Sequence, residues 1–338
     1  MKTEDMIKLP YANPPIFLSY HDIAFPLGVM QAHLGENFEK WVCTRTKEIF
    51  FTEWSDINQF DLSFHDIWGH FAGLTNEQSI TLEEDLIEVM GIDLLPVLKE
   101  ALRRGYYIYG AYNERYIRGK WAYQQADYDH DFLLIGCDNE MFISVGYLAD
   151  RRFHEFEISN QEMYDSLTTT GDGKLRLNFV RINENASAEN DIREAVEELE
   201  KYLSSAKALF SNDVRKLSYG ISSLDHLKKH FLREVHERNH LFADNRYCRI
   251  LYEHKWCLER MTAYFARGKN AELYRTAAQN NLKRTEQIRM LSLKMELTGK
   301  AAIVDQIARL IDDIIAEEIA YLPGFLDDLR TYSLPSSV

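Results

Sequence analysis

The spacing of hydrophobic and polar residues changes about halfway along the chain. Up to about residue 184, short apolar runs alternate with turn-forming residues, which is typical of a mixed α/β domain. After about residue 186, apolar residues recur at helical spacing with few interruptions. The sequence therefore predicts an α+β protein with two domains, an α/β domain over residues 1–184 and an α-helical bundle over residues 185–338.

Five segments of the first domain read as strands, and two of them form a predicted hairpin. Residues 130–136 and 141–148 are apolar runs separated by the turn-like sequence CDNE, so we expect them to pair antiparallel. The other strand candidates are residues 105–112, 153–159 and 174–182, with the loop TTTGDG before the last. Together these segments predict a central antiparallel sheet.

The second domain carries amphipathic helical segments. Four are predicted, at residues 191–203, 224–235, 247–265 and 300–322. One face of the last segment is apolar, formed by Ile303, Ile307, Leu310, Ile314 and Ile315. Several such helices joined by short loops favour a helical bundle.

Composition and charge argue against several classes of function. The 338 residues include 39 Lys and Arg against 53 Asp and Glu, a formal net charge of −14, which argues against a nucleic-acid binder. No apolar run approaches the ~20 residues of a membrane helix, and the start MKTEDMIKLP lacks the apolar core of a signal peptide. Four scattered cysteines do not suggest a disulfide framework. We expect a cytoplasmic protein with no nucleic-acid or membrane partner; the sequence leaves the oligomeric state, including a homo-oligomer, open.

The sequence His236-Glu237-Arg238-Asn239-His240 matches the H-E-x-x-H pattern. On a helix this spacing presents two imidazoles to zinc, with the glutamate as general base. The helical phase, however, puts both histidines opposite the apolar face that contains Leu227 and Phe231, so we favour a solvated charged face. We therefore expect no metal. A zinc metallopeptidase is kept as a distant alternative. The chain has no phosphate-binding glycine motif and no G-x-S-x-G, which argues against nucleotide-binding and hydrolase-elbow sites, and we expect no cofactor.

The predicted hairpin begins at His130, the position at which papain-like folds present a general base beside a nucleophile. The wider stretch YIYGAYNERYIRGKWAYQQADYDHDFLLIGCDNEMFISVGY resembles the corresponding region of the butirosin biosynthesis protein H-like family. The N-terminal NPPIFLSYHDIAFPLGVMQAH and, more loosely, RILYEHKWCLERM also resemble it. The family consists of papain-like cysteine acyltransferases of natural-product pathways, with an α-helical C-terminal region.

This resemblance implies an acyltransferase that forms an amide. Its donor would be a phosphopantetheine thioester on an acyl carrier protein or peptidyl carrier domain, and its acceptor a small-molecule amine. The family cysteine lies at the start of the first helix, where the helix dipole and a histidine favour the thiolate. Here the first cysteine is Cys43, past that helix. Matching the aromatic-then-FP pattern of the family puts Ser19 at the nucleophile position, and a frame shifted by three puts Asp22 there.

Loss of the cysteine leaves three hypotheses open. A Ser19–His130 pair accepts the acyl group, although a hydroxyl is far less acidic than a thiol of pKa ~8.5 and depends fully on its base. Alternatively, His130 deprotonates the acceptor amine without a covalent step. The third hypothesis is a catalytically inactive scaffold or carrier-binding protein of a biosynthetic assembly. Of these we favour an active acyltransferase in which Ser19 is the nucleophile, His130 its base and Asp150 the residue that orients His130.

Further residues are candidates for supporting roles. Asp150 is the nearest carboxylate on the strand that returns beside His130, and we expect it to orient that ring. A solvated acidic residue is an equally good interpretation of Asp150. Asn13 precedes Ser19 by six residues, the spacing of an oxyanion-hole amide in papain-like enzymes, or simply belongs to an extended segment.

Two surface features bear on ligands. A local basic cluster in this acidic protein, made of Arg115, Arg118 and Lys120, is a candidate docking patch for an acidic carrier, or a solvated turn. The same region is rich in aromatic residues, namely Tyr107, Tyr109, Tyr112, Tyr116, Trp121, Tyr123 and Tyr128. They suit a cleft for an acyl chain or pantetheine arm, but we favour the half-buried face of a sheet.

Overall fold

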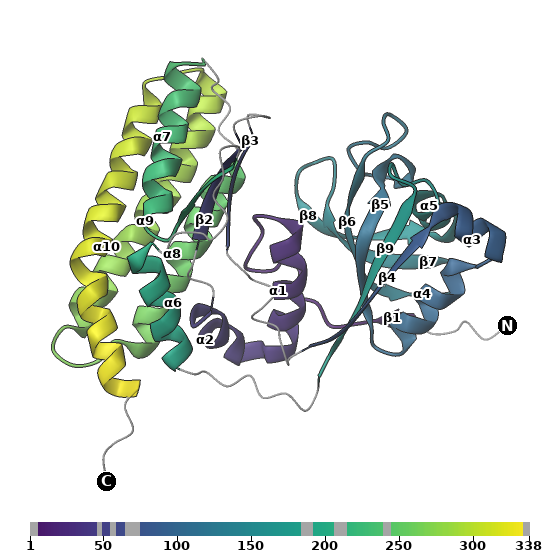
Figure 1. Cartoon of the computed structure of the whole chain (residues 1–338), viewed down its shortest axis with the longest axis horizontal. Coiled ribbons are helices and arrows are strands. Elements are labelled where there is room, and N and C mark those ends of the chain that lie inside the picture. Colours follow the sequence, from purple (N-terminus) through teal and green to yellow (C-terminus); the bar gives the residue numbers. More distant parts are fainter. Residues whose placement is uncertain are drawn as a thin grey trace, which may run out of the picture. The chain divides into compact units, whose positions relative to one another are not determined.

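The computed structural model describes residues 6–45, 49–54, 59–64, 75–183, 192–205, 215–238 and 245–333 (Figure 1). The chain divides into two compact units, each built from two stretches of sequence. The first unit contains Met1–Gly35 and Phe71–Ala188, and the second contains Glu36–His70 and Glu189–Val338. The predicted boundary at residue 184 lies close to Ala188, but residues 36–70, which the prediction included in the first domain, belong to the helical unit.

An antiparallel sheet forms the centre of the first unit. Within the described residues it has seven strands. Six follow the order β4 (Thr75–Glu83), β9 (Lys174–Ile182), β5 (Tyr107–Asn113), β6 (Asp129–Cys137), β7 (Met141–Tyr147) and β8 (Phe153–Ser159), and β1 (Ile7–Lys8) also pairs with β6. The predicted hairpin is confirmed as the antiparallel pair β6–β7. The other three strand predictions are also confirmed, as β5, β8 and β9.

Helices cover both faces of this sheet, because alternate residues of each strand point to opposite sides. One face carries α3 (Glu84–Met90), α4 (Leu94–Arg103) and α5 (Asn160–Leu167), which pack on a cluster that includes Ile108, Tyr112 and Phe132. The other face carries α1 (His21–Leu34), whose Phe25 and Val29 pack on Leu133 and Ile135. Figure 1 shows α1 and the group α3–α5 on opposite sides of the strands. This packing places the first turn of α1 near the start of β6.

Helices form most of the second unit. They are α2 (Phe38–Cys43), α6 (Ile192–Ser204), α7 (Ser222–His236), α8 (Asn245–Phe265), α9 (Ala271–Thr298) and α10 (Ile303–Ser333). The four predicted helices are confirmed as α6, α7, α8 and α10, although α10 continues through Pro323 beyond its predicted end. A small antiparallel sheet in the order β10 (Arg215–Tyr219), β2 (Ile49–Trp54) and β3 (Gln59–Phe64) packs against α7 and α8. This packing is why residues 36–70 belong to the helical unit.

None of the helices in the described ranges combines the length and the apolar character needed to cross a bilayer.

Inside the helical unit, a buried polar network joins three helices. Lys255 Nζ on α8 lies 2.7 Å from Glu318 Oε1 on α10, and the hydroxyl of Tyr202 on α6 donates to Glu318 Oε2 at 2.5 Å. Because a buried charge is costly unless it is paired, these groups hold one another in place.

A close approach of the chain to α1 fixes the position of that helix. The Tyr11 hydroxyl donates to the Ala24 carbonyl at 3.0 Å, and the Ala12 N–H donates to the Gly28 carbonyl at 3.1 Å. A Cβ at Gly28 would lie 2.4 Å from the Tyr11 ring. A residue with a side chain therefore does not fit at this position without a shift of the ring or the helix.

We predict that Gly28→Ala destabilises the protein by about 1–3 kcal/mol, the usual cost of overpacking. The sign is informative, because in an open helix the same change stabilises by about 1 kcal/mol. Urea unfolding of Gly28→Ala, Tyr11→Ala and the double variant measures the effect. The cost of Gly28→Ala should shrink in the Tyr11→Ala background. An equal cost in both backgrounds would show that the Tyr11 ring is not the obstacle.

Candidate functional site

Two histidines meet where α1 and β6 begin. His21 is the first residue of α1, and its ring centroid lies 4.6 Å from that of His130, the second residue of β6. His21 is only 6% exposed, whereas the side chain of His130 is 35% exposed. The pair therefore extends from the surface of the first unit into its interior.

His130 is oriented by a buried carboxylate. Glu114 begins η3 (Glu114–Tyr116), the short 3-10 helix that follows β5, and its Oε1 lies 2.8 Å from His130 Nδ1. In the register of the sheet, Tyr112 of β5 lies opposite His130, so Glu114 follows just beyond the paired residues. Because a carboxylate only accepts hydrogen bonds, Nδ1 carries the proton and Nε2 of the neutral ring carries a lone pair. This is the tautomer that a general base needs.

The carboxylate of Glu114 is itself paired with a buried lysine. Lys120 Nζ lies 3.3 Å from Glu114 Oε1 and donates to the Tyr147 carbonyl at 2.9 Å. Burial would raise the pKa of Glu114, but the hydrogen bond from His130 and the charge of Lys120 hold that pKa below its usual value. Burial lowers the pKa of Lys120, and Glu114 partly offsets this effect. Glu114 is thus an anion held between two basic groups.

His21 is a neutral, buried histidine. Its ring stacks on Phe25 at 4.6 Å, and its Nε2 accepts a hydrogen bond from the Tyr147 N–H at 3.3 Å. Burial, followed by the nearby His130 and Lys120, lowers the pKa of His21 well below its usual value. Its Nδ1 has no hydrogen-bond partner among the described residues. Since Nε2 accepts, the ring proton is on Nδ1.

The ring that meets His130 from the start of α1 is that of His21, which was not a predicted nucleophile. Ser19 is buried two residues before α1 begins, and Asp22 is the second residue of that helix and is partly buried. In the part of the chain that the structure describes, His130 contacts Glu114, His21 and the Tyr128 ring. His21 thus lies between Ser19 and Asp22, the two positions that the family pattern proposed for the nucleophile. Successive side chains of a helix point about 100° apart, so a shift of one residue changes which group faces His130.

Asp150 and Asn13 are not among the residues whose described contacts involve His130. Asp150 follows β7 in an exposed turn, where its Oδ2 is 2.8 Å from His154 Nε2. It therefore orients His154, and the carboxylate at His130 is that of Glu114, from the 3-10 helix that follows β5 on the other side of β6. The prediction considered the returning strand β7 and did not consider β5. Asn13 is exposed in a bend before Pro14.

The basic cluster is not a continuous exposed patch. Lys120 is buried against Glu114, as described above. Arg115 pairs with Asp127 at 3.1 Å, and Arg118 lies 3.7 Å from a carboxylate oxygen of Glu162. The surface cations of this turn are therefore both accompanied by carboxylates.

The H-E-x-x-H sequence does not lie on one helix. α7 ends at His236, and His236 Nε2 contacts Asp305 Oδ1 at 2.9 Å. His240 lies outside the described residues. Over the residues that the structure describes, no group of three or more His, Cys, Asp or Glu side chains is arranged to hold a metal.

The tyrosines of β5 divide between the two faces of the sheet. Tyr107 and Tyr109 lie on the side of α1, and Tyr112 lies on the side of α4 and α5. Tyr107 and Tyr112 are buried. The tyrosines of β5 therefore pack in the hydrophobic clusters on both faces of the sheet and do not line one wall of a cleft. This agrees with the interpretation that they are half-buried sheet residues.

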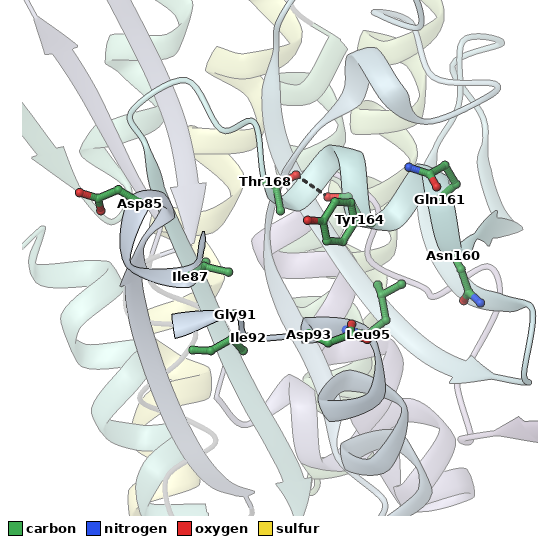
Figure 2. A pocket seen from close by; sticks show the side chains of 10 residues that line it. All are labelled: Asp85, Ile87, Gly91, Ile92, Asp93, Leu95, Asn160, Gln161, Tyr164 and Thr168. Carbon is green, nitrogen blue, oxygen red and sulfur yellow. Dashed lines mark hydrogen bonds between the residues drawn. The ribbon is translucent and has the colours of Figure 1, made fainter. Parts of the chain in front are cut away.

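A separate pocket of about 860 Å³ lies on the face that carries α3–α5. Figure 2 shows it between the turn Gly91–Ile92–Asp93 and the helix that bears Asn160 and Tyr164. Its walls are fixed locally, since Asp93 accepts from the Leu95 N–H and the Thr168 hydroxyl donates to the Tyr164 carbonyl at 2.9 Å. This pocket does not include the histidine pair.

A scan against protein-family models finds no match to this chain, and no curated protein matches it significantly in sequence.

We predict that His21 makes stability fall on acidification. Its folded pKa lies well below the ordinary value of ~6.5, so the unfolded chain binds a proton first as the pH falls. The contribution of the neutral His21 ring to the free energy of unfolding is complete above the ordinary pKa of ~6.5 and decreases below it. Between pH 7.5 and 5.5 the loss is about 1.4 kcal/mol. Urea unfolding at both pH values should show that the free energy of unfolding of His21→Gln falls by about this amount less than that of the wild type.

His230 on α7 provides a matched control, because burial lowers its pKa to about 4. His230→Gln should remove a pH dependence of the same sign. If His21→Gln keeps the full wild-type pH dependence while His230→Gln reduces it, the folded His21 is not held neutral.

Proposed function

We propose that this protein transfers an acyl group from a carrier-bound thioester to an amine, with His130 as the general base and without a covalent serine intermediate. The observation that carries the proposal is the hydrogen bond of 2.8 Å between Glu114 and His130. A partly exposed histidine with its Nδ1–H fixed on a buried carboxylate is an arrangement that suits proton abstraction.

The chemistry needs one base at the acceptor. The amine nitrogen forms a bond to the thioester carbonyl carbon, and the carbon–sulfur bond breaks. An acceptor that arrives as an ammonium ion gives one proton to His130, which later releases it to water. The proton lost from nitrogen as the new bond forms goes to the leaving thiolate. Buried Glu114 stabilises the imidazolium that exists between these steps, because opposite charges interact more strongly away from water.

The contact between His21 and His130 is the geometric reason to propose a direct transfer. A hydroxyl nucleophile must lie within hydrogen-bond reach of its base. At the start of α1 the side chain in contact with His130 is His21, which is buried and neutral. The resemblance to papain-like acyltransferases of natural-product pathways supports the donor and acceptor classes. The papain-like fold, the biosynthetic setting and the cytoplasmic location belong to this proposal.

A second candidate is a catalytically inactive protein that binds a carrier or an enzyme of the same assembly. One observation favours it: buried His21 occupies the end of α1 at which the family carries its cysteine. In this case the pair of Glu114 and His130 stabilises the fold without reacting.

The two candidates differ in an assay with short acyl-pantetheine thioesters and a primary amine. We predict amide formation by the wild type, with no acyl adduct in its intact mass. His130→Gln should lower the rate by about 100-fold or more, the usual contribution of a general base. Ser19→Ala should retain most of the activity. His154→Gln, a change at an exposed histidine that pairs with Asp150, is the matched control and should behave like wild type.

Two outcomes would contradict the proposal. An acyl adduct that disappears in Ser19→Ala would establish the covalent route. No amide from any donor, combined with binding of an acylated carrier protein, would favour the inactive candidate.

A further inference from the structure

Two exposed aromatic side chains lie on the approach to His130. The Trp121 ring is 63% exposed and meets the Tyr128 ring edge-to-face at 6.0 Å, and Tyr128 is 45% exposed. The Tyr128 ring in turn lies 5.3 Å from that of His130. Three partly exposed rings thus form a row that ends at the candidate base.

The backbone that carries this pair is fixed by hydrogen bonds. The Gln124 N–H donates to the Arg115 carbonyl at 2.9 Å, and the Tyr128 N–H donates to Asn113 Oδ1 at 3.2 Å. The Glu114 N–H donates to the Tyr128 carbonyl at 2.9 Å. Large aromatic side chains exposed together on a fixed backbone are typical of binding surfaces, where they contribute much of the affinity.

In the described ranges, neither of these two rings takes part in a cation–π contact with a basic side chain of the chain itself. Elsewhere in the chain, basic side chains lie over tyrosine rings: Arg181 over Tyr106 at 5.0 Å and Lys120 over Tyr112 at 5.6 Å. Within the described ranges, neither Trp121 nor Tyr128 has a lysine or arginine over its ring. The protein therefore uses cation–π contacts internally but leaves this pair unoccupied.

The charged side chains near the aromatic pair already have partners. Asp129 Oδ2 accepts from the Gly171 N–H at 2.7 Å, and Asp131 hydrogen-bonds Tyr109. The basic residues of the same turn are neutralised, since Arg115 pairs with Asp127 and Lys120 is buried against Glu114. Arg118 of the same turn lies 3.7 Å from Glu162, so each basic side chain of the turn has a carboxylate beside it and an ammonium ion meets no unpaired cation there.

We infer that Trp121 and Tyr128 bind the acceptor as a primary ammonium ion with an apolar chain, the charged end on Tyr128 beside His130 and the chain on Trp121. This inference rests on the proposed function and deepens it, since it names the residues that hold the amine acceptor and the apolar chain that this acceptor carries. The ammonium proton then has His130 as its nearest base. Binding of the ammonium ion does not itself require that acyl transfer occurs.

Binding is tested with n-hexylammonium and its neutral counterpart n-hexanol, titrated into the full chain at pH 7 by calorimetry. We expect hexylammonium to bind about tenfold more tightly than hexanol. Trp121→Ala and Tyr128→Ala should each weaken hexylammonium by about tenfold. Tyr164→Ala, at a tyrosine of similar exposure (44%) on α5, is the matched control and should leave binding unchanged. Circular dichroism and thermal melting establish that each variant is folded.

Kinetics separate this inference from the proposed function. In folded Trp121→Ala and Tyr128→Ala, KM for the amine should rise by about tenfold while KM for the thioester stays constant. If both variants form the amide with the wild-type KM for the amine, the inference is overturned and the proposed function stands. Hexylammonium binding that needs both rings, without any amide product, would support the inference and remove the proposed function. The inference would also be overturned if the wild type bound hexanol as tightly as hexylammonium, or if both variants bound hexylammonium with wild-type affinity.

Discussion

A buried ion pair between Lys120 and Glu114 holds the candidate site together. Both side chains are almost fully buried, and a buried charge without its partner costs several kcal/mol. Each residue therefore fixes the other, and each has a further contact: Glu114 with His130, and Lys120 with the Tyr147 carbonyl. Through these contacts the turn after β5 is joined to β6 and β7. The orientation of His130 is thus set by groups that cannot move separately.

Local pattern was sufficient for most of the fold. The strands β5–β9 and the helices α6, α7, α8 and α10 follow from alternation and helical spacing within each segment. The small sheet of the helical unit was missed for a physical reason. Its strand β10 pairs with β2, and residues 71–188 of the first unit lie between the two strands in the sequence. A local pattern does not reveal a partner so distant in sequence. The same pairing explains why residues 36–70 lie in the helical unit.

The candidate site was only partly predictable. His130 was found because it begins a recognisable hairpin strand. Glu114 was missed because the prediction considered only the strand that follows His130, although β5 lies on its other side with Tyr112 opposite. His21 was missed because a resemblance between sequences fixes a helix start only to within a few residues. Which side chain of a first turn faces a neighbouring strand depends on the helix rotation, and α1, buried on nearly all sides, gives no amphipathic signal of it.

The interleaving of the two units has a consequence for synthesis on the ribosome. The chain makes α2, β2 and β3 early, then the rest of the first unit, and only afterwards β10 and the long helices. The hairpin β2–β3 must therefore wait with one edge unpaired until β10 emerges to complete the sheet. During that interval the first unit can close around its own sheet, since both of its stretches have been made. The helical unit is therefore the last to fold. A nascent chain stopped near Ala188 would expose a strand edge and apolar surface, to which chaperones bind.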